Sequence, residues 1–302
     1  MLKQAPICIL LCLIGYLANS QTQLQQNWFN ESELLKHVKT LSSDAFEGRR
    51  TGTKGAEKAK KYIINQFHAL GVKPLTNKYS QDFSFGRRTK QYEATNVLGY
   101  IKGTKHKKKY IVISAHYDHE GIKQGQIYNG ADDNASGVGA LFSLAEYFKN
   151  NPPEHTVILA AFDAEELGLK GSNYFTKNPL VPLRNIIVNL NLDMISRSEK
   201  KELFVVGTET NEHFKSIIES YKKTPDFKLV IGHDSNDKLE NWTYSSDHAN
   251  FYKKDVPFLY FGVEDHKDYH EPTDDYENIL PKFYIKAVNA IISVFKTIDT
   301  TL

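Results

Sequence analysis

The sequence contains almost no cysteine, and this scarcity excludes one kind of metal site. Only Cys8 and Cys12 are present, and both lie within the first twenty residues. A structural zinc site built from thiolates is therefore excluded, and disulfides cannot hold the rest of the chain together. After the first twenty residues there is also no apolar run long enough to cross a membrane, so we expect no spanning segment there.

Neither sign of charge is in clear excess. The chain has 38 Lys and Arg against 36 Asp and Glu, a formal net charge of +2. This near-neutral balance argues against a nucleic acid as the natural partner. The one basic cluster, residues 105–109, follows Gly103 between two strand-like runs, and we expect it to form a solvated hairpin turn.

The start of the chain has the pattern of a secretory signal. Lys3 precedes a short apolar segment, residues 7–17, and small residues follow at positions 18–20. This order predicts a signal peptide over residues 1–20, which leaves residues 21–302 as a single domain in a secreted or periplasmic protein. The alternative, a buried N-terminal helix, is disfavoured by the polar residues from Gln21 onward.

Strand-like and helix-like segments alternate along the rest of the chain. The apolar runs are continuous, as in strands that are buried on both faces. They cover residues 110–115, 156–162, 186–192 and 256–261, with helical segments between them and an amphipathic helix over residues 281–298. This order predicts an α/β fold with a mostly parallel central sheet and helices on both faces.

Polar clusters directly follow these four apolar runs. His116 and Asp118 follow the first run, Glu165 and Glu166 the second, and Asp193 the third, while residues 264–270 follow the fourth. Ligands of open α/β sheets bind beyond the carboxyl ends of the strands, where these clusters would meet. Histidine and carboxylate are zinc ligands, and several carboxylates gathered together repel one another unless divalent cations neutralise them.

Five motifs in this order resemble those of the co-catalytic zinc exopeptidases, which include bacterial secreted leucyl aminopeptidases, aminopeptidase Y and glutamate carboxypeptidase. The resemblance extends from about Leu41 to the final helix. The motifs occupy residues 114–119, 130–137, 163–172, 191–194 and 269–270. The resemblance implies a zinc aminopeptidase-like three-layer sandwich, peptide substrates, and two zinc ions per chain that lie about 3.5–4 Å apart.

The resemblance also implies a set of metal ligands. His116 would bind one zinc and His270 the other, with Asp133 bridging both, and Glu166 and Asp193 would complete the two shells. The bridging Asp of the family lies three residues before the Ser-Gly pair that opens a helix, which selects Asp133 over Asp132. The peptide bond after this Asp is often cis in the family, so we expect the same of Asp133–Asn134.

Three further residues receive catalytic roles from the resemblance. Glu165 would be the general base, taking a proton from the attacking water and passing it to the leaving amine. Asp118 would hold the far ring nitrogen of His116. The Tyr269 hydroxyl would stabilise the oxyanion.

Other residues near these motifs have more than one interpretation. His119 either lines the pocket or completes its loop, and Asp132 is expected to cap or turn its own loop. Asp274 or Asp275 either braces the His270 loop or caps a helix. We expect residues 246–248 to line the pocket at most, and aromatic residues to make that pocket apolar: Trp242, Tyr244, Phe251 and Tyr252.

The expected activity is that of an aminopeptidase, with three alternatives left open. A carboxypeptidase or dipeptidase of the same family usually has an early inserted domain, for which residues 71–110 leave too little room. A single-zinc glutaminyl cyclase shares the fold without the full two-metal set. A binding protein that has lost catalysis would lack ligands, whereas all five are present here.

Overall fold

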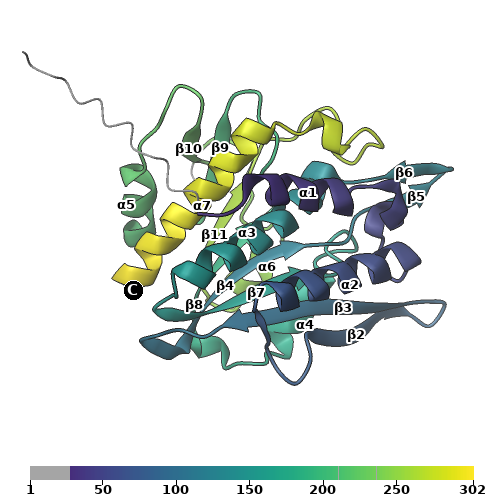
Figure 1. Cartoon of the computed structure of the whole chain (residues 1–302), viewed down its shortest axis with the longest axis horizontal. Helices are drawn as coiled ribbons and strands as arrows, with labels where there is room; N and C mark the ends of the chain where they lie inside the picture. Colours follow the sequence, from purple (N-terminus) through teal and green to yellow (C-terminus); the bar gives the residue numbers. More distant parts are fainter. Residues whose placement is uncertain (1–27, 210, 236) are drawn as a thin grey trace, which may run out of the picture.

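The computed structural model describes residues 28–209, 211–235 and 237–302 (Figure 1). The predicted signal peptide, residues 1–20, lies outside these described residues. Within them, no helix is both long and apolar enough to cross a membrane.

A nine-stranded sheet forms the centre of the molecule, in the order β1-β3-β7-β4-β8-β11-β9-β10 with β2 paired to β3. The strands are β1 (Lys73–Pro74), β2 (Ser80–Arg87), β3 (Lys90–Ile101), β4 (His106–His116), β7 (His155–Phe162), β8 (Ile186–Leu192), β9 (Glu202–Val206), β10 (Lys228–Ile231) and β11 (Phe258–Gly262). The central strands β7, β4, β8 and β11 are mutually parallel, as predicted. Antiparallel pairs lie on both sides of this centre, at β3 with β7 and at β11 with β9.

Helices cover both faces of the sheet (Figure 1). One face carries α1 (Glu31–Leu41), α2 (Lys54–Ala69), α3 (Gly137–Asn150) and α7 (Pro281–Thr301). The other face carries α4 (Lys170–Lys177) and α6 (His248–Tyr252). The remaining helix, α5 (Glu212–Ser220), lies beside α7. The predicted α/β architecture with a helix layer on each face is confirmed.

Burial on both faces explains the continuous apolar runs of the central strands. Along β4, Ile111 and Ile113 join the core under α1, α2, α3 and α7, whereas Val112 between them joins the core with Phe175 of α4 and Phe251 of α6. Successive side chains of a strand point to opposite faces, so a strand covered on both faces is apolar at most of its positions.

The expected hairpin at residues 105–109 is not formed. His106 to Lys109 begin β4 and are solvated, but β7 separates β3 from β4 in the sheet. Residues 102–105 still join β3 directly to β4, but the link passes the end of β7, whereas the crossover through α3 lies between the parallel strands β4 and β7.

Candidate active site

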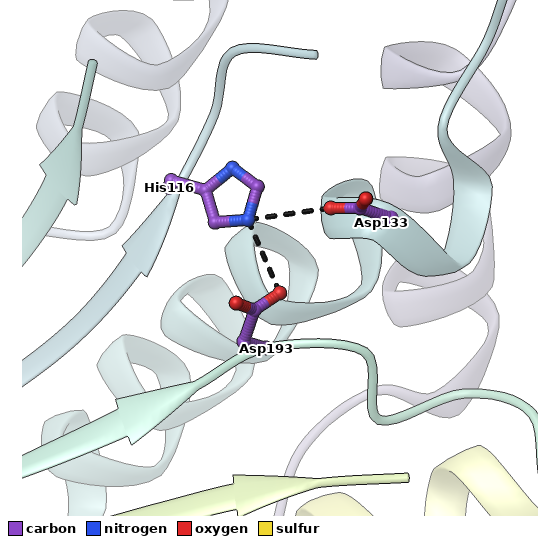
Figure 2. Close-up of side chains that lie close together, drawn as sticks. All are labelled: His116, Asp133 and Asp193. Carbon is purple, nitrogen blue, oxygen red and sulfur yellow. Dashed lines mark hydrogen bonds and ion pairs between the residues drawn. The ribbon is translucent and has the colours of Figure 1, made fainter. Parts of the chain in front are cut away.

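The carboxyl ends of β4 and β8 bring together three of the predicted ligands (Figure 2). Nε2 of His116 lies 3.1 Å from Oδ1 of Asp193 and 3.3 Å from Oδ1 of Asp133. His116 is the last residue of β4, Asp193 directly follows β8, and Asp133 lies in the turn Ala131–Ser136 before α3. All three are buried, and we call this group the inner half-site.

A second group shares Asp133 and lies nearer to solvent. Nε2 of His270 is 3.2 Å from Oδ2 of Asp133 and 3.2 Å from Oε2 of Glu166. The His270 side chain is 36% exposed, against 2% for His116. We call Asp133, Glu166 and His270 the outer half-site. Its histidine comes from the irregular segment between β11 and α7.

The turn that carries Asp133 has one feature that the sequence predicted and one that it did not. The peptide bond between Asp133 and Asn134 is cis, as expected. The Asn134 side chain donates to the backbone carbonyl of Leu192 and accepts from the backbone N–H of Gly137, so it ties the turn to the end of β8. This arrangement fixes Asp133 between the two half-sites.

The donor atoms present fit a zinc site. Groups of His, Asp and Glu that could hold a metal ion include His116 with Asp133 and Asp193, and their donor atoms lie within 4.8 Å of one another. Within the described residues, the buried Oε1 of Glu166 and both ring nitrogens of His119 have no hydrogen-bond partner. Buried polar atoms without partners are costly, and a cation bound by nitrogen and carboxylate oxygen would satisfy such atoms.

His119 belongs to the site, which the sequence left undecided. Its ring is fully buried, and Nδ1 lies 2.9 Å from Oε1 of Glu166, without the geometry of a hydrogen bond, and 3.6 Å from Oδ2 of Asp133. A side chain at Gly130 would collide with this ring, since an added Cβ would lie 2.5 Å from its Cγ atom. Gly130, whose φ is 58°, therefore leaves room for His119 beside the outer half-site.

The charges of the site strongly perturb its histidines and carboxylates. Burial and the charge of Asp133 would raise the pKa of Glu166, yet His119 and His270 lower it to about 2. Burial lowers the pKa of His270, but Asp133 and Glu166 outweigh this effect and raise it to about 11. Such mutual dependence is typical of functional sites and of ion-pair networks alike.

Asp118 holds two parts of the site through different atoms. Nδ1 of His116 donates to the backbone carbonyl of Asp118 at 3.2 Å, whereas the expected partner, the Asp118 carboxylate, lies 3.8 Å away. That carboxylate instead accepts from the backbone N–H groups of Glu165 and Glu166, at 3.0 and 3.3 Å. One residue thus orients His116 and the two glutamates that follow β7.

Glu165 and Tyr269 both line the cavity that opens onto the two half-sites. Burial raises the pKa of Glu165 well above its usual range, and the charges of Asp193 and Asp247 add to this effect against that of His116. The Tyr269 ring stacks on His270 with centroids 4.0 Å apart. The structure thus brings together every residue that the resemblance assigned to the site.

Arg49 supports the site and was missed by sequence reasoning. Its buried guanidinium donates to four backbone carbonyls, those of Leu41, Tyr117, Asn129 and Gly130. These bonds join the loop after His116 to the loop before Asp133. Burial lowers the Arg49 pKa to about 10 against the attraction of nearby carboxylates. No motif marked this residue, because its partners are backbone atoms from three separate segments.

Asp132 and Asp274 brace the turn that carries Asp133. The Asp274 carboxylate accepts from the backbone N–H groups of Asp132 and Asp133, both at 3.0 Å. Asp132 accepts from the Ser196 backbone N–H and hydroxyl. Of the two interpretations of Asp274, bracing therefore holds, and it links the His270 segment to the Asp133 turn. Asp275 accepts only from the Asn129 side chain within the described residues.

The cavity is less apolar than the sequence led us to expect. Of the four expected aromatic residues, only Trp242 lines it. Phe251 is buried in the core, and Tyr244 and Tyr252 line a separate surface hollow. Residues 246–248 do not line the cavity, and Asp247 is fully buried. Two carboxylates, Glu240 and Asp265, do line it.

Fold and site together define a metallopeptidase, and comparison with known proteins gives the family. Residues 96–295 match Peptidase family M28. The chain belongs to this family, which confirms the predicted resemblance to zinc exopeptidases.

Two relatives of known sequence illustrate the relationship. Aminopeptidase YwaD of Bacillus subtilis is 31% identical over 220 residues, which cover 70% of this chain and 43% of the relative. The alkaline phosphatase isozyme conversion protein of Escherichia coli is 28% identical over 195 residues, 60% of this chain and 55% of the relative. The chain thus spans about half the length of these relatives.

Solved structures share the fold at low sequence identity. A Zn-dependent exopeptidase from Parabacteroides distasonis superposes with a TM-score of 0.71 at 20% identity, covering 89% of this chain and 98% of that chain. A glutaminyl cyclase from Bacteroides thetaiotaomicron superposes equally well, with a TM-score of 0.71 at 21% identity and the same coverage. The fold alone therefore does not separate hydrolysis from cyclisation.

Proposed function

We propose that this protein is an aminopeptidase that binds two zinc ions and removes the amino-terminal residue of peptides. One observation carries the proposal. The two oxygens of Asp133 face different histidines, Oδ1 towards His116 and Oδ2 towards His270. A carboxylate that faces two nitrogen ligands in this way is placed to bridge two metal ions, with Asp193 completing one shell and Glu166 the other.

The residues around the half-sites suit hydrolysis. When bound, zinc supplies Lewis acidity that polarises the peptide carbonyl and makes water more acidic. Glu165 would take the proton of the attacking water and deliver it to the departing amine. Its side chain lines the cavity beside the half-sites, where it is placed to exchange a proton with water. The Tyr269 hydroxyl would donate to the oxyanion of the tetrahedral intermediate.

The charge of the cavity favours action at the amino terminus. Among the described residues that line it, none is Lys or Arg, whereas six are Asp or Glu. A carboxypeptidase has to hold the terminal carboxylate of its substrate, and a cation is the natural partner for that group. A free ammonium group, by contrast, is attracted to carboxylates.

Cyclisation of amino-terminal glutamine is the second candidate, because a glutaminyl cyclase shares the fold. It is disfavoured by the complete pair of half-sites, because a single-zinc glutaminyl cyclase would need only one of them. Export to the periplasm or the medium is also part of the proposal, and it rests on the signal-like pattern of residues 1–20.

The test is an assay of aminoacyl substrates with free and with acetylated amino groups, together with a glutaminyl peptide. The protein is measured as purified, after chelation, and after zinc is returned. We expect cleavage of the free amines only, loss of activity on chelation, and recovery with two zinc equivalents. Ring closure of the glutaminyl peptide without cleavage would overturn the proposal in favour of a cyclase, and cleavage from the carboxyl end in favour of a carboxypeptidase.

A further inference from the structure

Two carboxylates line the active-site cavity without a place in the proposed chemistry. Glu240 lies before Trp242 in the segment between β10 and α6, and Asp265 follows β11. Both are exposed, so they lie where the cavity meets solvent. Glu240 is near enough to Asp265 for its charge to add to the effect of burial in raising the pKa of Asp265.

The charge of the cavity does not balance without a further cation. Four of its carboxylates belong to the proposed machinery, namely Asp133, Glu165, Glu166 and Asp193. Two zinc ions would balance the charge of these four. Glu240 and Asp265 would then remain in excess, and among the described lining residues there is no Lys or Arg to pair with them. Carboxylates gathered without a cation repel one another, and a bound cation relieves the repulsion.

These two carboxylates lie nearer to solvent than the inner half-site. His116, Asp133 and Asp193 are buried, whereas Glu240 and Asp265 are exposed. In an aminopeptidase the α-ammonium group of the substrate sits next to the scissile carbonyl, and would therefore lie near Glu165 and the half-sites. Glu240 and Asp265 are then placed to meet a different group of the substrate.

Trp242 gives this end of the cavity a fixed wall. Its indole stacks on His233 with centroids 3.4 Å apart, and Phe204 and Tyr260 pack against it edge-on at 5.8 and 6.0 Å. The side chain is 8% exposed. A rigid aromatic wall beside carboxylates suits a side chain with an aliphatic stem and a cationic end.

We infer that Glu240 and Asp265, beside Trp242, form a subsite that selects substrates whose amino-terminal residue is Lys or Arg. The inference rests on the proposed aminopeptidase function and names its substrate class. The cavity volume, about 160 Å³, suits one terminal residue rather than a longer segment. A cationic side chain would reach the two carboxylates while the scissile bond lies at the half-sites.

The experiment compares each cationic substrate with a neutral substrate of nearly the same shape. Lysyl and norleucyl p-nitroanilides form one pair, and arginyl and citrullyl p-nitroanilides form the other. We expect kcat/KM to be about tenfold higher for the cationic member of each pair, and this preference to shrink as salt is added, because the carboxylates are exposed and their charges are screened. Equal kcat/KM within both pairs would overturn the inference.

A double variant tests the two carboxylates themselves. Glu240→Gln with Asp265→Asn keeps the shapes and removes both charges, so the cationic-to-neutral ratio of kcat/KM should fall to about one. The matched control is Glu199→Gln with Glu219→Gln, which removes the same charge from exposed positions outside the cavity. A ratio in the double variant that equals that of the control would overturn the assignment to these residues.

A binding measurement separates this inference from the proposed function. Calorimetry of the zinc-loaded protein measures the affinity for lysine amide and for norleucine amide, and therefore tests the subsite without turnover. Tighter binding of lysine amide, lost in the double variant, would support the subsite even if no p-nitroanilide were cleaved, and in that case only the aminopeptidase function would fail. Equal binding of the two amides would overturn the subsite while leaving any observed cleavage unaffected.

Discussion

The two half-sites contain the same kinds of ligand but are held in different ways. The inner half-site stands on the ends of two central strands, and His116 is almost fully buried. The outer half-site takes its histidine from an irregular segment, and that histidine is about one-third exposed. Asp133 belongs to both. The difference teaches that strand ends hold two of the three inner residues, His116 and Asp193, whereas the outer half-site depends on segments outside the sheet.

The largest expected effect comes from a residue that lines the cavity shared by the two half-sites. Glu165→Gln should lower kcat by about 10²–10⁴-fold, because a general base is lost while the ligands stay in place. Zinc content, measured by atomic absorption, should remain that of the parent protein. Near-normal turnover with full zinc content would show that Glu165 is not the base.

Removing each histidine in turn tests the comparison directly. In chelator, His116→Ala should lower the free energy of unfolding by about 3–5 kcal/mol, because it leaves Asp133 and Asp193 buried without their cationic partner. His270→Ala should cost about 1 kcal/mol or less, because its side chain is partly exposed to solvent. Urea denaturation of both variants is the measurement. Equal losses would mean that burial does not distinguish the two half-sites.

A smaller effect is expected at Asp274, whose carboxylate braces the turn that carries Asp133. Asp274→Asn should lower the free energy of unfolding by about 1–3 kcal/mol, because an amide cannot replace both oxygens that accept from Asp132 and Asp133. It should also weaken zinc binding by about tenfold, as loss of an outer-shell partner does. Asp275→Asn is the matched control. The measurement is calorimetric titration of zinc into both apo variants. Equal zinc affinities would contradict the role of Asp274 as a brace of the Asp133 turn.

The sequence predicted most of the fold because each element carries its own signal. The apolar runs marked the central strands, and an amphipathic pattern marked the final helix. The antiparallel margin at β9 was harder to foresee, since β9 is short and pairs with β11 rather than with its predecessor β8. The hairpin expected at residues 105–109 failed for the same reason: strand order depends on contacts between segments far apart in the chain.

The candidate site, like the fold, could be predicted only in part. The proposed ligands stand in short motifs beside strand ends, so their approximate meeting place could be predicted. The Asp118 carboxylate, by contrast, turned from its expected partner on His116 to the backbone of Glu165 and Glu166. Arg49 gave no signal at all, because it binds carbonyl groups, which every residue has.

The sequence by itself determined the family, the ligand types and the layered α/β architecture, since these depend on local composition and on the order of motifs. Only the tertiary structure decided the character of the cavity. Its wall combines Trp242 and Glu240 from one loop with Asp265 from another, and the expected aromatic neighbours Tyr244, Phe251 and Tyr252 point elsewhere. Which side chains of separate loops face the same space is set by how the loops pack, and local sequence does not encode that.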